Sequence, residues 1–116
     1  MATTVLIVDD HPSFRATARM LLEAEGYSVV GEAQDGTSAL LAAGRLLPQV
    51  VLLDINLPDV DGFTVADKLR DGPSDVVFIS SRDASDYGNS IADSGARGFI
   101  AKGELSGASL AEVLRR

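Results

Sequence analysis

The sequence predicts an α/β protein in which a parallel β-sheet lies between two layers of helices. Short apolar runs alternate along the chain with longer amphipathic segments, which is the pattern of repeated βα units. The apolar runs are rich in Val, Ile and Phe and do not alternate with polar residues, as expected for parallel strands that are covered on both faces. At 116 residues the chain is expected to form a single domain, residues 1–116.

Five apolar runs are the expected strands, and they cover residues 4–8, 28–31, 50–53, 76–79 and 98–100. The run 28–31 is the weakest, so we expect it at an edge of the sheet. Parallel strands are joined by crossovers, which are right-handed in nearly all proteins. The segments between the strands should therefore cover both faces, giving a three-layer α/β/α sandwich.

Capping residues and helix breakers predict five helices, which are 12–25, a segment from 35 or 37 to 47, 62–70, 84–94 and 107–114. Pro12 and Gly26 bracket the first of these. Asp61 and Ser106 can cap the third and the fifth. The fourth segment is polar and is interrupted by Gly88, so we expect it to be a poor helix.

The composition excludes several classes of protein. The chain has no Cys, so it can form neither a disulfide nor a thiolate metal site. The net charge is −7 and the ten basic residues are scattered, so binding of nucleic acid or of an anionic membrane by this domain alone is not expected. No apolar segment approaches the roughly 18 residues that span a membrane. We therefore expect a cytoplasmic protein whose charge suits a divalent cation or a partner with basic edges.

Polar residues stand where four of the five predicted strands end. Asp9 and Asp10 follow the first strand, Asp54 the third, Ser80 the fourth and Lys102 the fifth. Each residue taken alone has an ordinary explanation, such as a turn, a helix cap or a solvated charge. The carboxyl ends of parallel strands share one edge of the sheet, where open α/β proteins bind ligands. Their joint placement therefore predicts a site.

The residue types limit the chemistry of this site. Two carboxylates about 4–5 Å apart repel each other by roughly 3–4 kcal/mol at an effective dielectric of about 20. Three carboxylates beside one lysine therefore need raised pKa values or a cation. All-oxygen ligands favour Mg²⁺. A carboxylate can also attack phosphorus, and phosphoryl transfer needs little beyond a metal, a lysine and a hydroxyl donor.

Four stretches carry a family resemblance: "VLIVDDH", "VVLLDINLPDVDGF", "VVFISS" and "GARGFIAKGEL". In this order and spacing they resemble the receiver domain of response regulators in bacterial two-component signalling, over nearly the whole chain. The resemblance implies a flavodoxin-like (CheY-like) sheet in the order 2-1-3-4-5. It also implies a module that catalyses only its own phosphorylation and dephosphorylation and is not otherwise an enzyme.

The resemblance implies specific roles for the site residues. Asp54 would accept a phosphoryl group from a sensor histidine kinase, a phosphotransfer protein or a small phosphodonor such as acetyl phosphate. Asp10, Asp54 and the backbone carbonyl of Asn56 would hold Mg²⁺, and Asp9 would act mainly through a metal-bound water. Lys102 would pair with the phosphoryl oxygens.

Four further residues would transmit or shape the switch. Ser80 would donate a hydrogen bond to the phosphoryl group, and Phe99 would be the switch aromatic that turns inward when Ser80 moves. Pro58 would shape the loop after the third strand, and Gly62 would let the next helix begin tightly against it. Phosphorylation adds roughly −1.5 to −2 charge, so the surfaces of 84–94 and 98–102 should change and control binding of a downstream protein or output domain. A phosphorylation-dependent homodimer is compatible with this scheme.

The chain departs from the family pattern at two positions. Receivers often carry Pro after the conserved lysine, in a cis peptide, whereas this chain has Gly103, which leaves that peptide's geometry open. Phe rather than Tyr at position 99 leaves no hydroxyl there to mark the inward state. Asn56 and Arg82 flank the site and are expected to tune the lifetime of the phosphoryl group. We assign no catalytic role to His11.

Four functions can be weighed against the sequence. We expect a stand-alone receiver that acts through protein contacts. The alternative is the receiver of a DNA-binding transcriptional regulator, in which Arg115 and Arg116 would begin the linker. A Mg²⁺-dependent aspartyl-phosphate phosphohydrolase is disfavoured because Asn56 stands where such enzymes carry a second Asp and because the chain has no cap domain. A P-loop enzyme is disfavoured because no G-x-x-x-x-G-K-[ST] stretch occurs.

Overall fold

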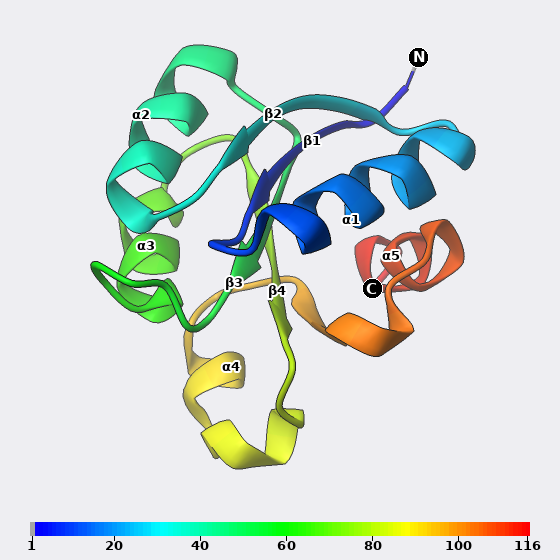
Figure 1. Cartoon of the computed structure of the whole chain (residues 1–116). Coiled ribbons are helices and arrows are strands. Elements are labelled where there is room, and N and C mark those ends of the chain that lie inside the picture. The colour runs from blue at the N-terminus through cyan, green and yellow to red at the C-terminus, as the bar shows by residue number, and fades with distance from the viewer. Residues whose placement is uncertain (1) are drawn as a thin grey trace.

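The sheet of this protein has five parallel strands, as the sequence predicts. The computed structural model describes residues 2–116, and its strands are β1 (Thr4–Val8), β2 (Ser28–Ala33), β3 (Val50–Asp54), β4 (Asp75–Ser80) and β5 (Gly98–Ala101). Their order is β2-β1-β3-β4-β5, and every neighbouring pair is parallel (Figure 1). The expected strand order is thus confirmed, with the weak strand β2 at one edge.

Helices cover both faces of the sheet. They are α1 (Pro12–Ala24), α2 (Gly36–Leu46), α3 (Gly62–Leu69), α4 (Ser90–Asp93) and α5 (Gly107–Leu114), with 3₁₀ turns η1 (Ala84–Tyr87) and η2 (Lys102–Glu104). Helices α1 and α5 share one apolar core with the sheet, while α2 and α3 share the other. Figure 1 shows α1 and α5 on one side of the strands and α2 and α3 on the opposite side. The three-layer sandwich is confirmed.

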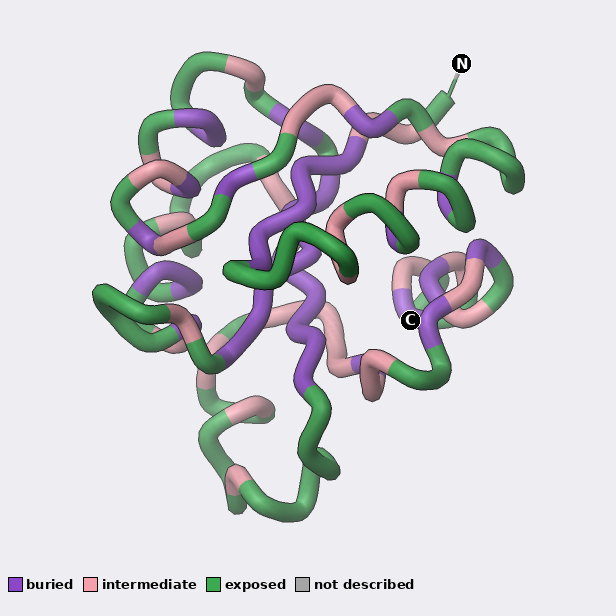
Figure 2. Tube along the Cα trace, in the orientation of Figure 1, coloured by how far each residue is buried: buried purple, intermediate pink, exposed green. Residues whose placement is uncertain are grey.

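Strand β3 explains the long apolar runs of the sequence. Val50 and Leu52 belong to the core under α1 and α5, whereas Val51 and Leu53 belong to the core under α2 and α3. Successive residues of a strand point to opposite faces of the sheet. Because helices cover both faces here, all four side chains are buried. The purple path through the centre of Figure 2 follows these strands. Buried apolar side chains on both faces leave the strand ends as the place for polar chemistry.

Side-chain caps fix where three helices begin, and therefore how the loops at the strand ends run. Asp35 accepts a hydrogen bond from the Ser38 amide at 2.8 Å, so Asp35 rather than Thr37 opens α2. Asp61 accepts from the amide of Thr64 at 2.8 Å and caps α3, as predicted. Ser106 caps α5 in the same way. Each cap satisfies a backbone donor that the helix itself leaves free.

The predicted helix 84–94 is the main correction. It is broken into η1 and the four-residue α4, and none of the residues in either element is buried. Gly88 lies between them with φ of 57°, a left-handed conformation that ends the 3₁₀ turn. No peptide bond of the described residues is cis, including Lys102–Gly103. Among these residues no helix has both the length and the apolar character needed to cross a membrane.

Candidate functional site

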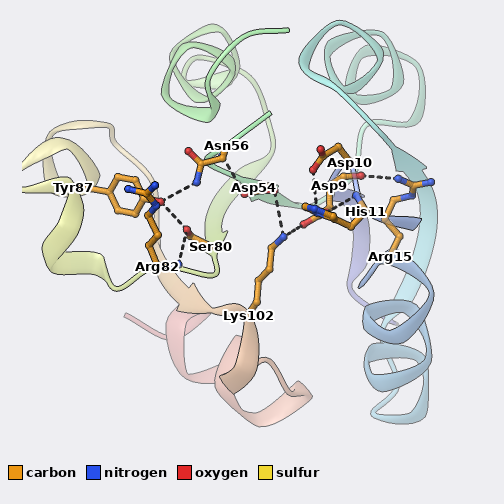
Figure 3. A network of polar contacts seen from close by, with 10 residues as sticks. All are labelled: Asp9, Asp10, His11, Arg15, Asp54, Asn56, Ser80, Arg82, Tyr87 and Lys102. Atoms are coloured by element: carbon orange, nitrogen blue, oxygen red, sulfur yellow. Dashed lines mark hydrogen bonds and ion pairs between the residues drawn. The ribbon is translucent and has the colours of Figure 1, made fainter. Parts of the chain in front are cut away.

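The predicted site residues meet at one edge of the sheet. Asp9 and Asp10 follow β1, Asp54 ends β3, Ser80 ends β4 and Lys102 follows β5. Figure 3 shows these side chains gathered around the strand ends, with Lys102 reaching between the carboxylates of β1 and β3. Ligand oxygens of the three aspartates lie within 4.8 Å of one another, together with a nitrogen of His11. The shared edge thus brings together residues that lie up to 93 positions apart.

Asp54 occupies the middle of the site. Only 2% of the residue is exposed. Its Oδ1 accepts a hydrogen bond from the Asn56 amide at 3.0 Å, and its Oδ2 lies 3.3 Å from Lys102 Nζ. Burial raises the pKa of the carboxyl group and the charge of Asp9 adds to this, against the opposing effects of the Asn56 amide and Lys102. The ionised form of Asp54 is therefore destabilised mainly by burial.

Asp9 and Lys102 form the closest ion pair. Asp9 is fully buried, and its Oδ2 lies 2.5 Å from Lys102 Nζ. Its Oδ1 accepts hydrogen bonds from the amide and ring Nδ1 of His11 at 2.8 and 3.0 Å. Burial alone would lower the pKa of Lys102, but the hydrogen bond from Lys102 to Asp9 and the charges of Asp54 and Asp9 outweigh it and raise the pKa. The Nζ of Lys102 also lies 4.7 Å from the centre of the Phe14 ring. The two carboxylates and this ring together hold the ammonium group in place.

The donor set fits a hard divalent cation. The three aspartates supply carboxylate oxygens, and the Asp10 side chain is about one-third exposed, which leaves the cluster open to solvent on that side. Oxygen ligands of this kind suit Mg²⁺. Burial is the main cause of the raised pKa of Asp54, and the charge of Asp9 adds to it. A cation bound beside Asp54 would stabilise its ionised form.

The loop between β3 and α3 is held tightly against the site. A Cβ on Gly62 would lie 2.6 Å from the backbone oxygen of Asp54 and 2.7 Å from the Cα of Ile55, so only glycine fits. The Gly62 amide also donates to the Ile55 carbonyl at 2.7 Å. Pro58 lies in this loop. The start of α3 is therefore fixed directly to the chain that carries Asp54.

Asp59 is a residue of this loop that the sequence analysis missed. Its carboxylate accepts hydrogen bonds from the amides of Gly36 and Thr37 at 2.8 and 3.0 Å and from the Thr37 hydroxyl at 2.9 Å. The amides of Gly36 and Thr37, followed by the Thr37 hydroxyl and the Val60 amide, hold the pKa of Asp59 far below its usual range. Asp59 thus ties the loop to the first turn of α2, a partner more than 20 residues away that no local pattern could indicate.

The hydroxyl of Ser80 contacts a residue that the sequence did not predict to be part of the site. Its hydroxyl is fully buried, lies 2.6 Å from the Tyr87 hydroxyl and accepts a hydrogen bond from the Arg82 amide at 3.0 Å. The Asn56 side-chain nitrogen also donates to the Tyr87 hydroxyl at 3.1 Å. Tyr87 lies in the segment expected to be a weak polar helix, and no sequence pattern indicated its role. It supplies a tyrosine hydroxyl to the site although position 99 has none.

Phe99 lies behind Tyr87. It is half-buried against the core under α2 and α3, and its ring centre lies 6.3 Å from that of Tyr87. Phe63 packs on Tyr87 as well, edge to face at 5.9 Å. The predicted switch aromatic is therefore in contact with the side chain that holds Ser80.

Comparison with known proteins agrees with this geometry. The family model described as "Response regulator receiver domain" matches residues 5–115. The chain belongs to this family. The receiver domain of the putative response regulator NarL from Mycobacterium tuberculosis superimposes with a TM-score of 0.87 and 35% identity, over 99% of this chain and 98% of that one. The receiver fold and family predicted from the sequence are thereby confirmed.

Curated relatives of this receiver are bacterial regulators. A putative transcriptional regulator of Pseudomonas aeruginosa is 37% identical over 95% of this chain and 52% of its own length. The nitrate/nitrite response regulator protein NarP of Escherichia coli is 42% identical over 84% of this chain and 47% of its own length. BvgA of Bordetella pertussis, described as a putative positive transcription regulator of virulence factors, is 38% identical over 90% and 51%. The chain spans about half the length of these relatives.

Proposed function

We propose that this receiver is a signalling switch in which Asp54 accepts a phosphoryl group in the presence of Mg²⁺. One observation carries the proposal: a buried aspartate with a raised pKa lies between two other carboxylates and the ammonium group of Lys102. Asp10, Asp54 and the backbone carbonyl of Asn56 would hold the cation, and Asp9 would act through a water molecule. Once bound, the cation would neutralise negative charge on the transferring group.

Asp54, Lys102 and Ser80 have different roles in the proposed phosphoryl transfer. An oxygen of Asp54 attacks phosphorus, and the bond to the donor, a phosphohistidine or acetyl phosphate, breaks with its electron pair leaving on the donor. Lys102 already lies 3.3 Å from Asp54 and follows the new negative charge. The hydroxyl of Ser80 donates to a phosphoryl oxygen. Because the added charge is −1.5 to −2, both side chains are drawn towards Asp54.

The change reaches a partner through the surface formed by α4, β5 and α5. A groove of about 330 Å³ lies next to β5 and α5 and the start of η1, with Phe99, Ile100 and Val113 as apolar lining. Its charged lining is mainly acidic, with Asp83, Glu104 and Glu112 beside one basic residue, Arg116. A partner that offers apolar side chains with a basic edge fits this groove. Phe99 links the groove to the site, because it lines the groove and also packs near Tyr87.

The relatives favour an output domain on the same polypeptide over a stand-alone receiver. Those described as transcriptional regulators are about twice as long as this chain. An open reading frame that continues past Arg116 into a helix-turn-helix would support the receiver of a DNA-binding regulator. A stop codon directly after Arg116 would support a stand-alone receiver.

Mass spectrometry of the intact protein tests the proposal. Incubation with acetyl phosphate and Mg²⁺ should add the mass of one phosphoryl group, and omission of Mg²⁺ should prevent this. Asp54→Asn should abolish the label, while Asp71→Asn, which removes an exposed carboxylate elsewhere, should keep it. Label at the wild-type level in Asp54→Asn would refute the assignment. Release of phosphate over many turnovers from an organic phosphate would instead support a phosphohydrolase.

A further inference from the structure

The hydroxyl of Tyr87 joins two residues on opposite sides of the site. It lies 2.6 Å from the hydroxyl of Ser80, at the end of β4, and accepts a hydrogen bond from the Asn56 side chain, beyond the end of β3. Figure 3 shows Tyr87 entering from the η1 side with both contacts drawn. Tyr87 itself contacts no carboxylate of the site in the described residues, so it reaches the site only through Ser80 and Asn56.

The surroundings of Ser80 define which hydroxyl donates. Ser80 is fully buried, and its oxygen already accepts from the Arg82 amide. Among the described residues, the only acceptor within hydrogen-bonding distance of the Ser80 proton is the Tyr87 oxygen. A buried hydroxyl proton without an acceptor is costly, so Ser80 donates to Tyr87. The partly exposed Tyr87 can direct its own proton to water.

The ring of Tyr87 is fixed by packing that does not depend on its hydroxyl. Phe63 from α3 contacts it edge to face at 5.9 Å, and Phe99 from β5 lies on it at 6.3 Å in a tilted arrangement. A phenylalanine at position 87 would keep these contacts. The ring contacts and the hydroxyl contacts can therefore be separated by a single substitution.

We propose that Tyr87 is a positioning residue that holds Ser80 and Asn56 in the unphosphorylated state, so that a phosphoryl group on Asp54 must compete with Tyr87 for the Ser80 proton. This inference rests on the proposed function of Asp54. A phosphoryl oxygen is a charged acceptor and wins, because hydrogen bonds to charged groups are about twice as strong as neutral ones. When Ser80 turns away, Tyr87 loses one of its two donors, which weakens the attachment of η1 beside Gly88, whose φ of 57° already marks a break in the segment.

The affinity for beryllium fluoride with Mg²⁺, a mimic of the phosphoryl group, tests the competition by calorimetry. Tyr87→Phe should bind beryllium fluoride about 2- to 10-fold more tightly than the wild type, which is what one competing neutral hydrogen bond is worth. In a Ser80→Ala background the same substitution should change the affinity less than about 2-fold, since no proton remains to compete for. The matched control is Tyr27→Phe, which removes the only other tyrosine hydroxyl, one that donates to the Gly107 carbonyl far from the site.

Tyrosine fluorescence supplies a readout that does not require Tyr87 to be replaced. The chain has no Trp and two Tyr, so Tyr27→Phe leaves Tyr87 as the only fluorophore of this kind. Its emission should change when beryllium fluoride and Mg²⁺ are added, and Ser80→Ala should remove most of that change.

Three results would overturn the inference: unchanged or weaker binding by Tyr87→Phe, an equal gain in the Ser80→Ala background, or constant Tyr87 emission. Failure of the proposed function is distinct from these. In that case the wild type itself would neither bind beryllium fluoride nor carry a phosphoryl label on Asp54.

Discussion

Replacing Asp54 by Asn should stabilise the metal-free protein. In the cluster, oxygens of Asp9 and Asp10 lie within 4.8 Å of an oxygen of Asp54, which corresponds to a repulsion of roughly 3.5 kcal/mol from each at an effective dielectric of about 20. The attraction between Asp54 and Lys102, which lie 3.3 Å apart, is worth about 5 kcal/mol on the same scale. The charges alone are therefore unfavourable by at most about 2 kcal/mol, because solvent screens the repulsion from the partly exposed Asp10, and the burial of Asp54 adds a further cost.

Asparagine keeps the size of the side chain and an oxygen for the Asn56 amide, but it carries no charge. We therefore expect Asp54→Asn to raise the free energy of unfolding by about 1–2 kcal/mol at pH 7 in EDTA, a gain of roughly 3–10 °C in melting temperature for a domain of this size. Thermal and urea unfolding followed by circular dichroism would measure it. Asp71→Asn is the control, since it makes the same change in net charge at an exposed position.

The dependence on pH and Mg²⁺ gives the same prediction a second test. The pKa of Asp54 is raised in the folded state, so the native protein keeps a proton that the unfolded chain has already lost. Stability of the wild type should fall as pH rises from the ordinary aspartate value through this raised pKa, and the fall should be smaller in Asp54→Asn. Mg²⁺ should stabilise the wild type more than the variant. If Asp54→Asn were equally or less stable than the wild type in EDTA, the reasoning from charge crowding would be refuted.

Three further substitutions test the surroundings of the site. Lys102→Met should cost about 3 kcal/mol in EDTA, because it leaves buried carboxylates without their cation, and Mg²⁺ should restore part of this loss in an unfolding titration. Gly62→Ala should cost at least about 2 kcal/mol, since its Cβ would meet backbone atoms, whereas Gly103→Ala, with open space around it, should cost less than about 1 kcal/mol; equal losses would contradict this. Asp59→Asn should speed amide hydrogen exchange at Gly36, and unchanged exchange would show that the loop anchor is not needed.

The sequence predicted the fold because its signals are local. A run such as 50–53, which is apolar at every position, is typical of a strand covered on both faces in a parallel sheet, and Asp61 and Ser106 mark helix starts through bonds that reach three residues. Convergence of Asp9, Asp54 and Lys102 followed from the rule that parallel strands end at one edge. These inferences required no knowledge of side-chain packing.

The unpredicted parts of the site depend on contacts between distant segments. Asp59 caps α2 across 22 and 23 residues, and Asn56 reaches Tyr87 across 31. No periodicity or spacing records such a pairing. Likewise, Lys102 lies 2.5 Å from Asp9 and 3.3 Å from Asp54, a difference that no sequence pattern indicates. The break at Gly88 was visible in the sequence as a weakness, but its consequence, two separate short elements, required the structure.

The shortness of these two elements bears on how the switch works. A helix of four residues has almost no intrinsic stability in water, so α4 must be held by its neighbours. The contacts described for this segment are few: Ile91 packs against the core, Arg70 donates to the Asp93 carbonyl at 2.9 Å, and Tyr87 holds η1 through its ring packing and through its hydroxyl contact with Ser80. In a segment stabilised so weakly, one hydrogen bond of about 1 kcal/mol changes the ratio of attached to released forms about fivefold. Under the proposed mechanism, phosphorylation of Asp54 would need no large rearrangement, because loss of the contact between Tyr87 and Ser80 would be enough to shift the population of the α4 surface.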